Sequence, residues 1–488
     1  MGNNLKKDAI TGMIWSGLQK YSTMIIHFVS GIILARLLTP FDYGCIGMLS
    51  IFMSIAGSFI DGGFGSALIQ KKHATQEDYS TIFFWNLIVS TIVYIILFFC
   101  APLIARFYNI PILSQVLRVQ AIVLFINAFT LVQSNQLRKN LNFKLISIVT
   151  ILTSVVALSV TIIMAYYGFG VWSLVAQNII MASIPALVYW FYVKWRPLWT
   201  FSWSSFKELF AFGSFMFLTH ILNNLGSNVQ GLLIGKMYNP ATMGYYSKAH
   251  STEVLASSSI SSVISQVTYP LYAKVQDDVK MLINMVRKLT MVISYLTFPL
   301  MFILMMTAKP IFILLYSDRW LQSVPYFQVL CLAGIVSCLI SVNTQTISAI
   351  GKSKQMFIAT LLKRCMGIGF IVAGMFIYGM KGLLCGVLLN TYFSYFVNIV
   401  LVSKYIGYKW YRQIKDLLPV ALISIVAISV SYFSIHYFDF DIYMDAIFKT
   451  FVFIIVYILL SLVFKLDAFH YTLDVIPEKF RFWQKNNS

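Results

Sequence analysis

The sequence has 488 residues, of which 59% are hydrophobic and only 11% are charged. Soluble domains carry about 25% charged residues, so this composition excludes a protein whose whole surface faces water. The net charge of +19 does not indicate nucleic-acid binding, because the basic residues lie in short loops between apolar runs and not on one helix face or in a tail.

Fourteen apolar segments are long enough to be membrane helices, since about 20 mostly apolar residues are needed to cross ~30 Å of hydrocarbon. They are 10–37, 43–67, 80–105, 113–136, 143–167, 171–193, 207–236, 242–273, 283–307, 325–349, 356–378, 382–403, 416–436 and 446–464. A break at 378–382 separates two of them. The first is interpreted as a retained helix and not a signal peptide, because no small-residue cleavage site follows a short hydrophobic region. We therefore expect an all-α polytopic membrane protein.

The positions of the basic residues predict how these helices are oriented. If the N-terminus is cytoplasmic, most of the 36 lysines and arginines fall in segments on the cytoplasmic side, where such residues are enriched in membrane proteins. One missed or invented helix would place every later loop on the wrong side. The alternation therefore favours an even number of helices, with both termini cytoplasmic.

The two halves of the sequence resemble each other at an offset of 200 residues. Gly31 corresponds to Gly231, and the Pro40 and Gly44 pair corresponds to Pro240 and Gly244. Chance identity among apolar residues is the alternative. Because six helices separate the copies, the repeat predicts two lobes of like orientation, related by an axis along the membrane normal. The expected organisation is an N-terminal lobe of six helices (1–200), a C-terminal lobe of six helices (201–405), and two further helices with a cytoplasmic tail (406–488).

Polar residues inside apolar segments are the best functional indicators, because they are costly in hydrocarbon and usually face a bundle interior or a wet cavity. In the first segment, Lys20 and His27 are seven residues apart and share a helix face with Ser16. Lining of a cavity is one interpretation, and snorkelling of Lys20 to the cytoplasmic interface is the other. Asp61 is the corresponding ionisable residue of the second segment.

The seventh and eighth segments carry the other polar groups. His220, Asn223, Asn224 and Ser227 form a stripe on the seventh helix, with Asn228 at its margin. This stripe predicts either a cavity wall or a hydrogen-bonded seam between helices. The eighth segment contributes Lys248, His250 and Glu253. Two helices from each repeat thus hold the ionisable groups, as expected for a central cleft between the lobes.

The motifs of catalysis and metal binding are missing from the sequence. It contains no GxxxxGK[ST] phosphate loop, no HExxH and no GxSxG, and it has no hydrophilic domain on which to build an active site. The six cysteines lie in or beside apolar segments without a CxxC pair, so no metal site or disulfide framework is indicated. We expect the chain not to be an enzyme.

Five stretches resemble the polysaccharide transporter family, which includes the flippases for O-antigen, capsule and colanic acid. They are 35–44 (ARLLTPFDYG), 61–70 (DGGFGSALIQ), 240–246 (PATMGYY), 269–278 (YPLYAKVQDD) and 317–320 (SDRW). This family belongs to the multidrug, oligosaccharidyl-lipid and polysaccharide exporter superfamily. The resemblance implies two six-helix lobes around an alternately opening cavity, formed chiefly by the first, second, seventh and eighth helices.

The resemblance also implies a function: export of undecaprenyl-pyrophosphate-linked oligosaccharide, coupled to an ion gradient. Similar proteins that flip the peptidoglycan precursor carry several arginines in the cavity, and this sequence has none at that depth. Lys20 and the histidines would have to supply the positive field instead. The expected cavity residues are Lys20, His27, Arg36, His220, Asn223, Asn224, Ser227, Asn228, Lys248 and His250, and Glu253 and Asp61 are the candidates for coupling to H⁺ or Na⁺.

Two alternatives remain at this point. A cation-coupled multidrug exporter of the same superfamily would be expected to place acidic residues in the cavity of the first lobe, and a membrane polysaccharide polymerase or ligase would be expected to carry a large external loop. For the flippase we expect the bacterial cytoplasmic (inner) membrane as the location, lipid-linked oligosaccharide and membrane lipid as ligands, and no cofactor. A polysaccharide polymerase and a chain-length regulator are the expected protein partners, and nucleic acid is not expected.

Overall fold

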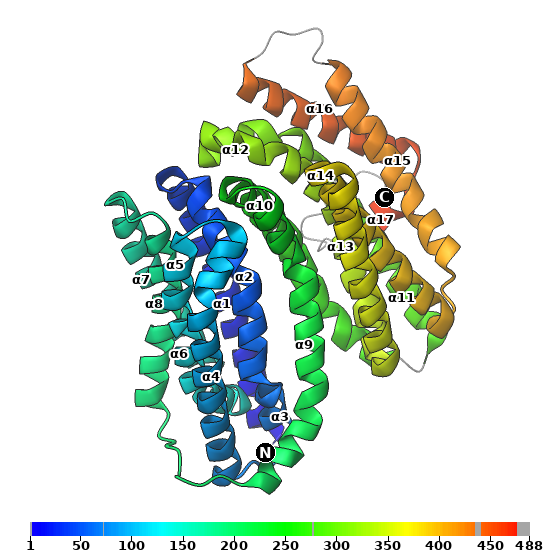
Figure 1. Ribbon diagram of the computed structural model, residues 1–488. Coiled ribbons are helices and arrows are strands. Elements are labelled where there is room, and N and C mark those ends of the chain that lie inside the picture. Colours follow the sequence, from blue (N-terminus) through cyan, green and yellow to red (C-terminus); the bar gives the residue numbers. More distant parts are fainter. Residues whose placement is uncertain (1, 72, 276–277, 435–440, 476–488) are drawn as a thin grey trace. The chain divides into compact units, whose positions relative to one another are not determined.

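The computed structural model describes residues 2–71, 73–275, 278–434 and 441–475, and every regular element in these ranges is a helix (Figure 1). The helices of the first half are α1 (Gly2–Leu37), α2 (Pro40–Asp61), α3 (Phe64–Gln70), α4 (Gln76–Tyr108), α5 (Ile112–Gln120), α6 (Ile122–Lys139), α7 (Phe143–Tyr166), α8 (Val171–Tyr192) and α9 (Trp203–Met237). Those of the second half are α10 (Pro240–Lys274), α11 (Val279–Met306), α12 (Ala308–Tyr316), the 3₁₀ helix η1 (Asp318–Ser323), α13 (Val324–Ala349), α14 (Ser353–Ile406), α15 (Trp410–Ser434), α16 (Ile442–Val463) and α17 (Asp467–Val475). The all-α prediction is confirmed.

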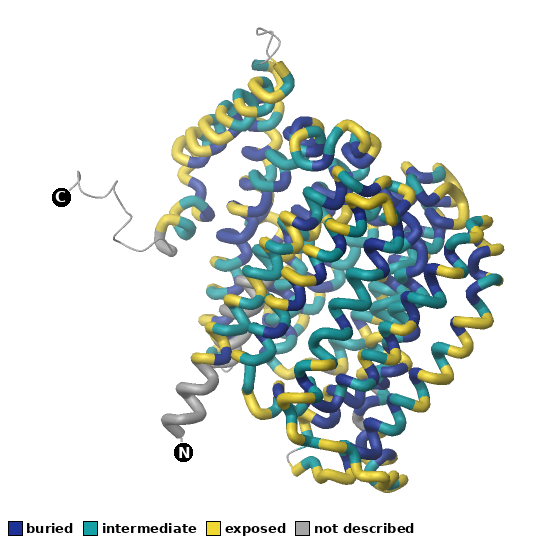
Figure 2. Tube along the Cα trace, turned by 90° about the vertical axis from the view of Figure 1, so that its left-hand side faces the viewer, coloured by how far each residue is buried: buried dark blue, intermediate teal, exposed yellow. Residues whose placement is uncertain are grey.

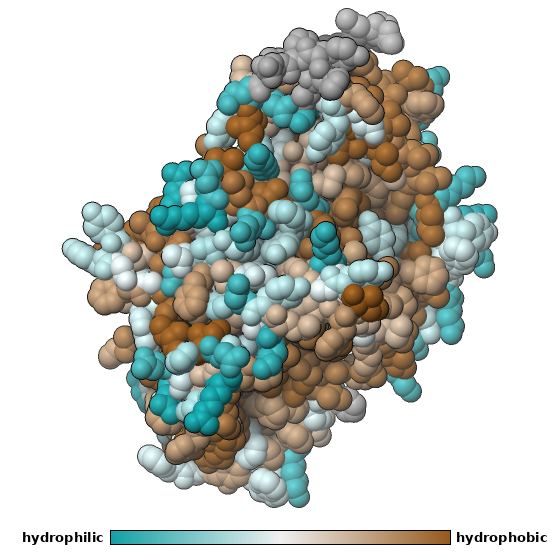
Figure 3. Space-filling view, turned by 45° about the horizontal axis from the view of Figure 1, so that its top comes forward, coloured by the Kyte–Doolittle hydropathy of each residue, from teal (hydrophilic) through white to brown (hydrophobic). Residues whose placement is uncertain are grey.

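The helices are apolar and long enough to cross a membrane. In the described ranges eleven qualify by length and hydropathy, and a twelfth does if the two parts of α9, which bends by 54°, count as one span. The prediction of fourteen differs because it also counts α10 and treats α14 as two helices. Exposed positions follow the outer sides of many helices (Figure 2), and broad hydrophobic areas lie on the surface in view in Figure 3. This is the surface of a multi-pass membrane protein, in which lipid is the solvent.

The long helix α14 contains the predicted break. Tyr378 and Gly379 leave helical geometry, and Gly379 has φ of 60° and ψ of −137°, a conformation that glycine adopts without steric cost. The segments of α14 before and after the break pack closely against each other. A Cβ on Gly374 would overlap the backbone of Gly382, and a Cβ on Gly382 would overlap that of Gly374. The expected separation of 356–378 from 382–403 is thus explained by one glycine conformation and one pair of apposed glycines.

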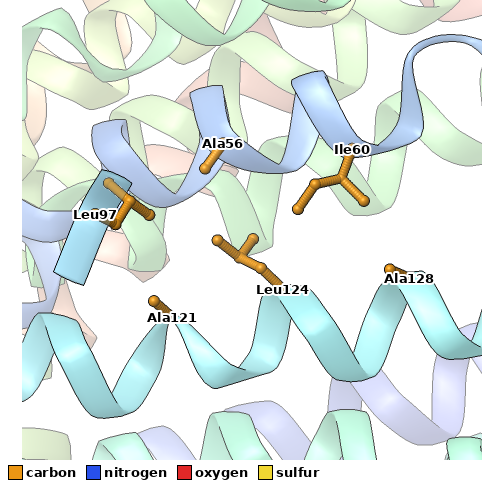
Figure 4. Close-up of a cluster of buried hydrophobic side chains, with 6 residues drawn as sticks. All are labelled: Ala56, Ile60, Leu97, Ala121, Leu124 and Ala128. Atoms are coloured by element: carbon orange, nitrogen blue, oxygen red, sulfur yellow. The ribbon is translucent and has the colours of Figure 1, made fainter. Parts of the chain in front are cut away.

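By its internal contacts the chain divides into two compact units, residues 1–247 and 248–488. The first unit therefore includes α9, which the predicted lobe boundary at 200 assigns to the second lobe. In this unit α1 packs on α7, α2 packs on α9, and α4 and α8 pack on α6. Figure 4 shows one of its cores, where the alanines Ala56, Ala121 and Ala128 let α2 and α6 approach around Ile60, Leu97 and Leu124.

The residues matched by the internal repeat make reciprocal contacts within the first unit. Thr39 caps α2 and Asn239 caps α10, each accepting a hydrogen bond from the backbone N–H three residues later. A Cβ on Gly44 would overlap the carbonyl oxygen of Pro240, and a Cβ on Gly244 would overlap that of Pro40. Residues 200 positions apart thus occupy equivalent places, which supports the interpretation of the two halves as a repeat.

In the second unit, α11 packs on α13 and also on the C-terminal helices α15 and α17. Arg287 of α11 donates two hydrogen bonds to the Asp416 carboxylate of α15, with Nε to Oδ2 at 2.9 Å and Nη2 to Oδ1 at 3.0 Å. The Tyr408 hydroxyl donates to Oδ2 of the same carboxylate at 2.6 Å. Burial, and then this hydrogen bond, raise the pKa of Tyr408, so the hydroxyl remains a donor at neutral pH.

Candidate substrate site

The predicted site residues are divided between the two units. The first unit holds Lys20, His27, Arg36, Asp61, His220, Asn223, Asn224, Ser227 and Asn228, and the second holds Lys248, His250 and Glu253.

On α1, the side chains of Lys20 and His27 are both exposed. The contact of α1 with α7 is made by its neighbours: the Ser147 hydroxyl donates to the Trp15 carbonyl oxygen at 2.9 Å and to Gln19 Oε1 at 3.3 Å. Lys20 and His27 are therefore free of that packing and present polar groups on an open face of the helix. Exposure of this kind fits both a wet cavity wall and snorkelling, so the role of Lys20 stays a prediction. Arg36, near the end of α1, is exposed as well.

The polar stripe of α9 has two distinct sides. Asn224 Nδ2 donates to the Ser58 hydroxyl of α2 at 2.7 Å, and Asn228 Oδ1 accepts from the Ser50 hydroxyl at 3.1 Å. These two asparagines take part in a hydrogen-bonded seam between α9 and α2. His220 and Ser227 are exposed and Asn223 is half-buried, so the remainder of the stripe lies outside this seam.

In the second unit, Lys248 and Glu253 are buried in the protein. Lys248 is only 4% exposed, and its Nζ lies 4.0 Å from the centre of the Tyr316 ring and 5.7 Å from that of Trp320. Such a geometry is a cation–π interaction. Glu253 is 7% exposed and shares a hydrogen bond with the Ser257 side chain. His250 is exposed, so among the polar residues predicted on α10 only this one presents an accessible side chain.

Asp61 belongs to a polar pocket that sequence reasoning missed. The pocket has a volume of about 310 Å³ and is lined by α2, α6 and α8, with Asn135 and Arg138 beside Asp61. A second pocket of about 390 Å³ adjoins it and shares Asn127 among its lining residues. The sequence carried an indication of this site, because 127, 130, 134 and 138 are all polar and recur at helical spacing along α6.

A pocket in the second unit has a different chemical character. It measures about 590 Å³ and lies in the second unit between α11, α13, the second half of α14 and α15. Its lining consists of aliphatic and aromatic side chains, including Phe298, Leu339 and Tyr395. This pocket suits hydrocarbon and offers little to bind a charged or hydroxylated group.

Known proteins resemble this chain over most of its length. TuaB of Bacillus subtilis, a teichuronic acid biosynthesis protein, is 24% identical over 72% of this chain and 74% of its own. WzxC of Escherichia coli, a lipopolysaccharide biosynthesis protein, is 23% identical over 83% of this chain and 84% of its own. ExoT of Rhizobium meliloti, a succinoglycan biosynthesis transport protein, is 22% identical over 74% and 73%.

The fold is shared with a solved structure. The lipid II flippase MurJ in an inward closed conformation aligns with a TM-score of 0.75 and 17% identity, covering 94% of this chain and all of that one. At this identity the likeness concerns the fold. With the relatives above it confirms that the chain is a polytopic transporter and not an enzyme. The family model described as "Polysaccharide biosynthesis protein" matches residues 33–325, and because this range is more than half of the sequence, the chain belongs to that family.

Proposed function

We propose that this protein flips an undecaprenyl-pyrophosphate-linked oligosaccharide, the repeat unit of an O-antigen, capsule or exopolysaccharide, across the bacterial cytoplasmic membrane by alternating access. The observation that carries the proposal is the match to polysaccharide biosynthesis proteins over most of the chain, on the fold of a flippase. The relatives named here are polysaccharide proteins, which favours this substrate over the small cations of a multidrug exporter.

The exposed polar face of α1 is suited to the head group of such a substrate. A pyrophosphate is anionic, and Lys20 and His27 are exposed on one side of a membrane helix. A lysine ammonium placed there offsets the anionic charge while the prenyl chain remains in lipid. Within the same unit, the exposed imidazole of His220 offers a further hydrogen-bond donor, and positive charge when it is protonated. His250, in the second unit, is also exposed and is proposed as a further residue that binds the head group.

Transport against a gradient needs an energy source, and we assign coupling to H⁺ or Na⁺ at Glu253 or Asp61. Glu253 is buried beside Ser257, and Asp61 lines a polar pocket. Carboxylate oxygens bind either ion, and a buried carboxylate exchanges protons when its surroundings change. A gradient-dependence measurement in proteoliposomes, with Glu253→Gln and Asp61→Asn compared, distinguishes the two sites.

The proposed orientation follows from the basic residues, with both termini in the cytoplasm. The substrate then enters from the side on which lipid-linked sugars are assembled. On the opposite side a polymerase that joins the repeat units, together with a chain-length regulator, must consume the product. We propose these two as functional partners.

Deletion of the gene in its source bacterium tests the function. We expect loss of surface polysaccharide together with accumulation of the lipid-linked repeat unit in the membrane, and restoration of both by the wild-type gene. Lys20→Ala should restore export poorly although the protein is inserted normally. Lys415→Ala, which removes an exposed lysine at the start of α15, is the matched control and should restore export fully. Unchanged lipid-linked sugar levels in the deletion strain would contradict the proposed function.

A further inference from the structure

A polar groove runs through the first unit along α2. It consists of the two adjoining pockets of about 310 and 390 Å³, and we call it the α2–α6–α8 groove. Ile46 lines one pocket and Asp61 the other, and these residues are about 22 Å apart along the helix at 1.5 Å per residue. Its polar lining residues are Ser50, Ser54, Asp61, Gln120, Asn127, Thr130, Ser134, Asn135, Arg138 and Asn178.

Two buried side chains of the groove have polar atoms without a partner. Gln120 and Asn135 are each 6% exposed. Within the described residues, Gln120 Oε1 and Asn135 Nδ2 have no hydrogen-bond partner. One is an acceptor and the other a donor, and each is costly to leave unpaired in a membrane protein. Both atoms are themselves covered by protein, whereas Asn127, which lines both pockets, is exposed, so the accessible lining of the groove favours a polar occupant over a hydrocarbon chain.

The lining favours an occupant that is neutral and rich in hydroxyl groups. Amide side chains both donate and accept hydrogen bonds, as hydroxyls do. Arg138 and Asp61 bring opposite charges to the same pocket, so the groove as a whole has no excess charge that would select an ionic occupant along its length. The groove also contains Met53, Met181 and other apolar contacts suited to the carbon face of a sugar ring.

We propose that the α2–α6–α8 groove is a subsite for the uncharged sugars of the transported oligosaccharide. The inference rests on the proposed function and adds the part of the protein that recognises the glycan. Lys20 and His27, to which the proposed function assigns the pyrophosphate, do not line this groove. The amides contribute preference for a glycosylated lipid, and the basic residues contribute affinity for any pyrophosphate lipid.

The test compares two probes with the full-length protein in lipid nanodiscs. One probe is the lipid-linked oligosaccharide pool extracted from the source bacterium lacking this gene, and the other is undecaprenyl pyrophosphate without sugar. We expect the wild-type protein to bind the first more tightly. Asn127→Leu should reduce that preference roughly two- to tenfold, the loss of one hydrogen bond, and should leave affinity for the bare lipid unchanged.

Two further variants keep the test decisive. Met181→Phe fills the groove without removing a hydrogen bond and should also lower only the preference for the glycosylated probe. Asn86→Leu is the matched control, because Asn86 is a fully buried amide on α4, has no partner among the described residues and lies outside the groove. It should bind both probes as the wild type does.

The outcomes separate the subsite from the function. If the wild-type protein binds both probes equally, or if Asn127→Leu and Met181→Phe weaken both to the same extent, the glycan subsite is wrong while the flippase proposal stands. If the wild-type protein binds neither probe, the proposed function fails and the subsite with it.

Discussion

Replacing Asp416 with alanine should loosen the attachment of α15 to α11. The Asp416 side chain is 13% exposed and receives three hydrogen bonds, two from Arg287 and one from Tyr408. Hydrogen bonds to a charged group are each worth about 1.5–3 kcal/mol when shielded from water. The Arg287 side chain is 41% exposed, so solvent screens much of the contribution that its two hydrogen bonds make to stability. We expect a total cost of about 2 kcal/mol.

The assay is unfolding in a titration of sodium dodecyl sulfate against mixed micelles, followed by tryptophan fluorescence. A double-mutant cycle with Arg287→Met isolates the pair, and we expect a coupling free energy of about 1 kcal/mol. Asp445→Ala is the control, because Asp445 pairs with Lys449 one turn along the same helix at 2.6 Å and, among the described residues, has no ion pair with a second helix. Such a pair is worth about 0.3–0.5 kcal/mol. A coupling energy near zero, or equal costs at 416 and 445, would refute the argument.

Three further predictions concern the first unit. Gly44→Ala should lower the midpoint of thermal unfolding, because the added Cβ would overlap the Pro240 carbonyl. Gly17→Ala should be neutral or stabilising, because that glycine faces open space. Equal shifts of the midpoint in the two variants would contradict this. Asn224→Ala should cost about 0.6–1.7 kcal/mol in the same detergent titration, and no cost would show that its bond to α2 contributes nothing. Burial lowers the pKa of Lys71, but its bonds to Glu208 and Asp78 outweigh burial and raise it. Its contribution to stability should therefore persist at neutral pH and decline as the pH rises above the usual value of 10.5, so the Lys71→Gln protein should be less stable than the wild type at pH 7, and the difference should shrink above pH 10.5; a difference that is absent at pH 7 would contradict this.

Local features were predictable from the sequence because they depend on neighbouring residues. Runs of about 20 apolar residues define the membrane helices, and the break at Gly379 was evident because glycine tolerates the conformation that ends a helix. The count of fourteen was less secure, because α10 is too polar to qualify by hydropathy. That polarity is the reason α10 attracted functional interpretation.

The contacts of the predicted site residues could not be derived from the sequence, because a helical stripe reveals which residues share a face but not what the face contacts. Asn224 and Asn228 share their stripe with His220, yet their side chains form hydrogen bonds with serines of α2. Lys248 is a further example: its aromatic partner Tyr316 is distant in the sequence. The polar spacing on α6 was visible, but it has no ionisable residue at membrane depth, and Asn127 was overlooked for that reason.

The matched glycines of the two halves have a consequence for sequence variation. In a symmetric dimer every contact occurs twice, because residue i of one copy contacts residue j of the other and the reverse. The contacts of Gly44 with Pro240 and of Gly244 with Pro40 repeat that isologous pattern inside a single polypeptide. Each faces a backbone carbonyl and not the other's side chain. A larger residue at one position is therefore not relieved by any change at the other, and homologous sequences should keep both positions small independently, without covariation between them.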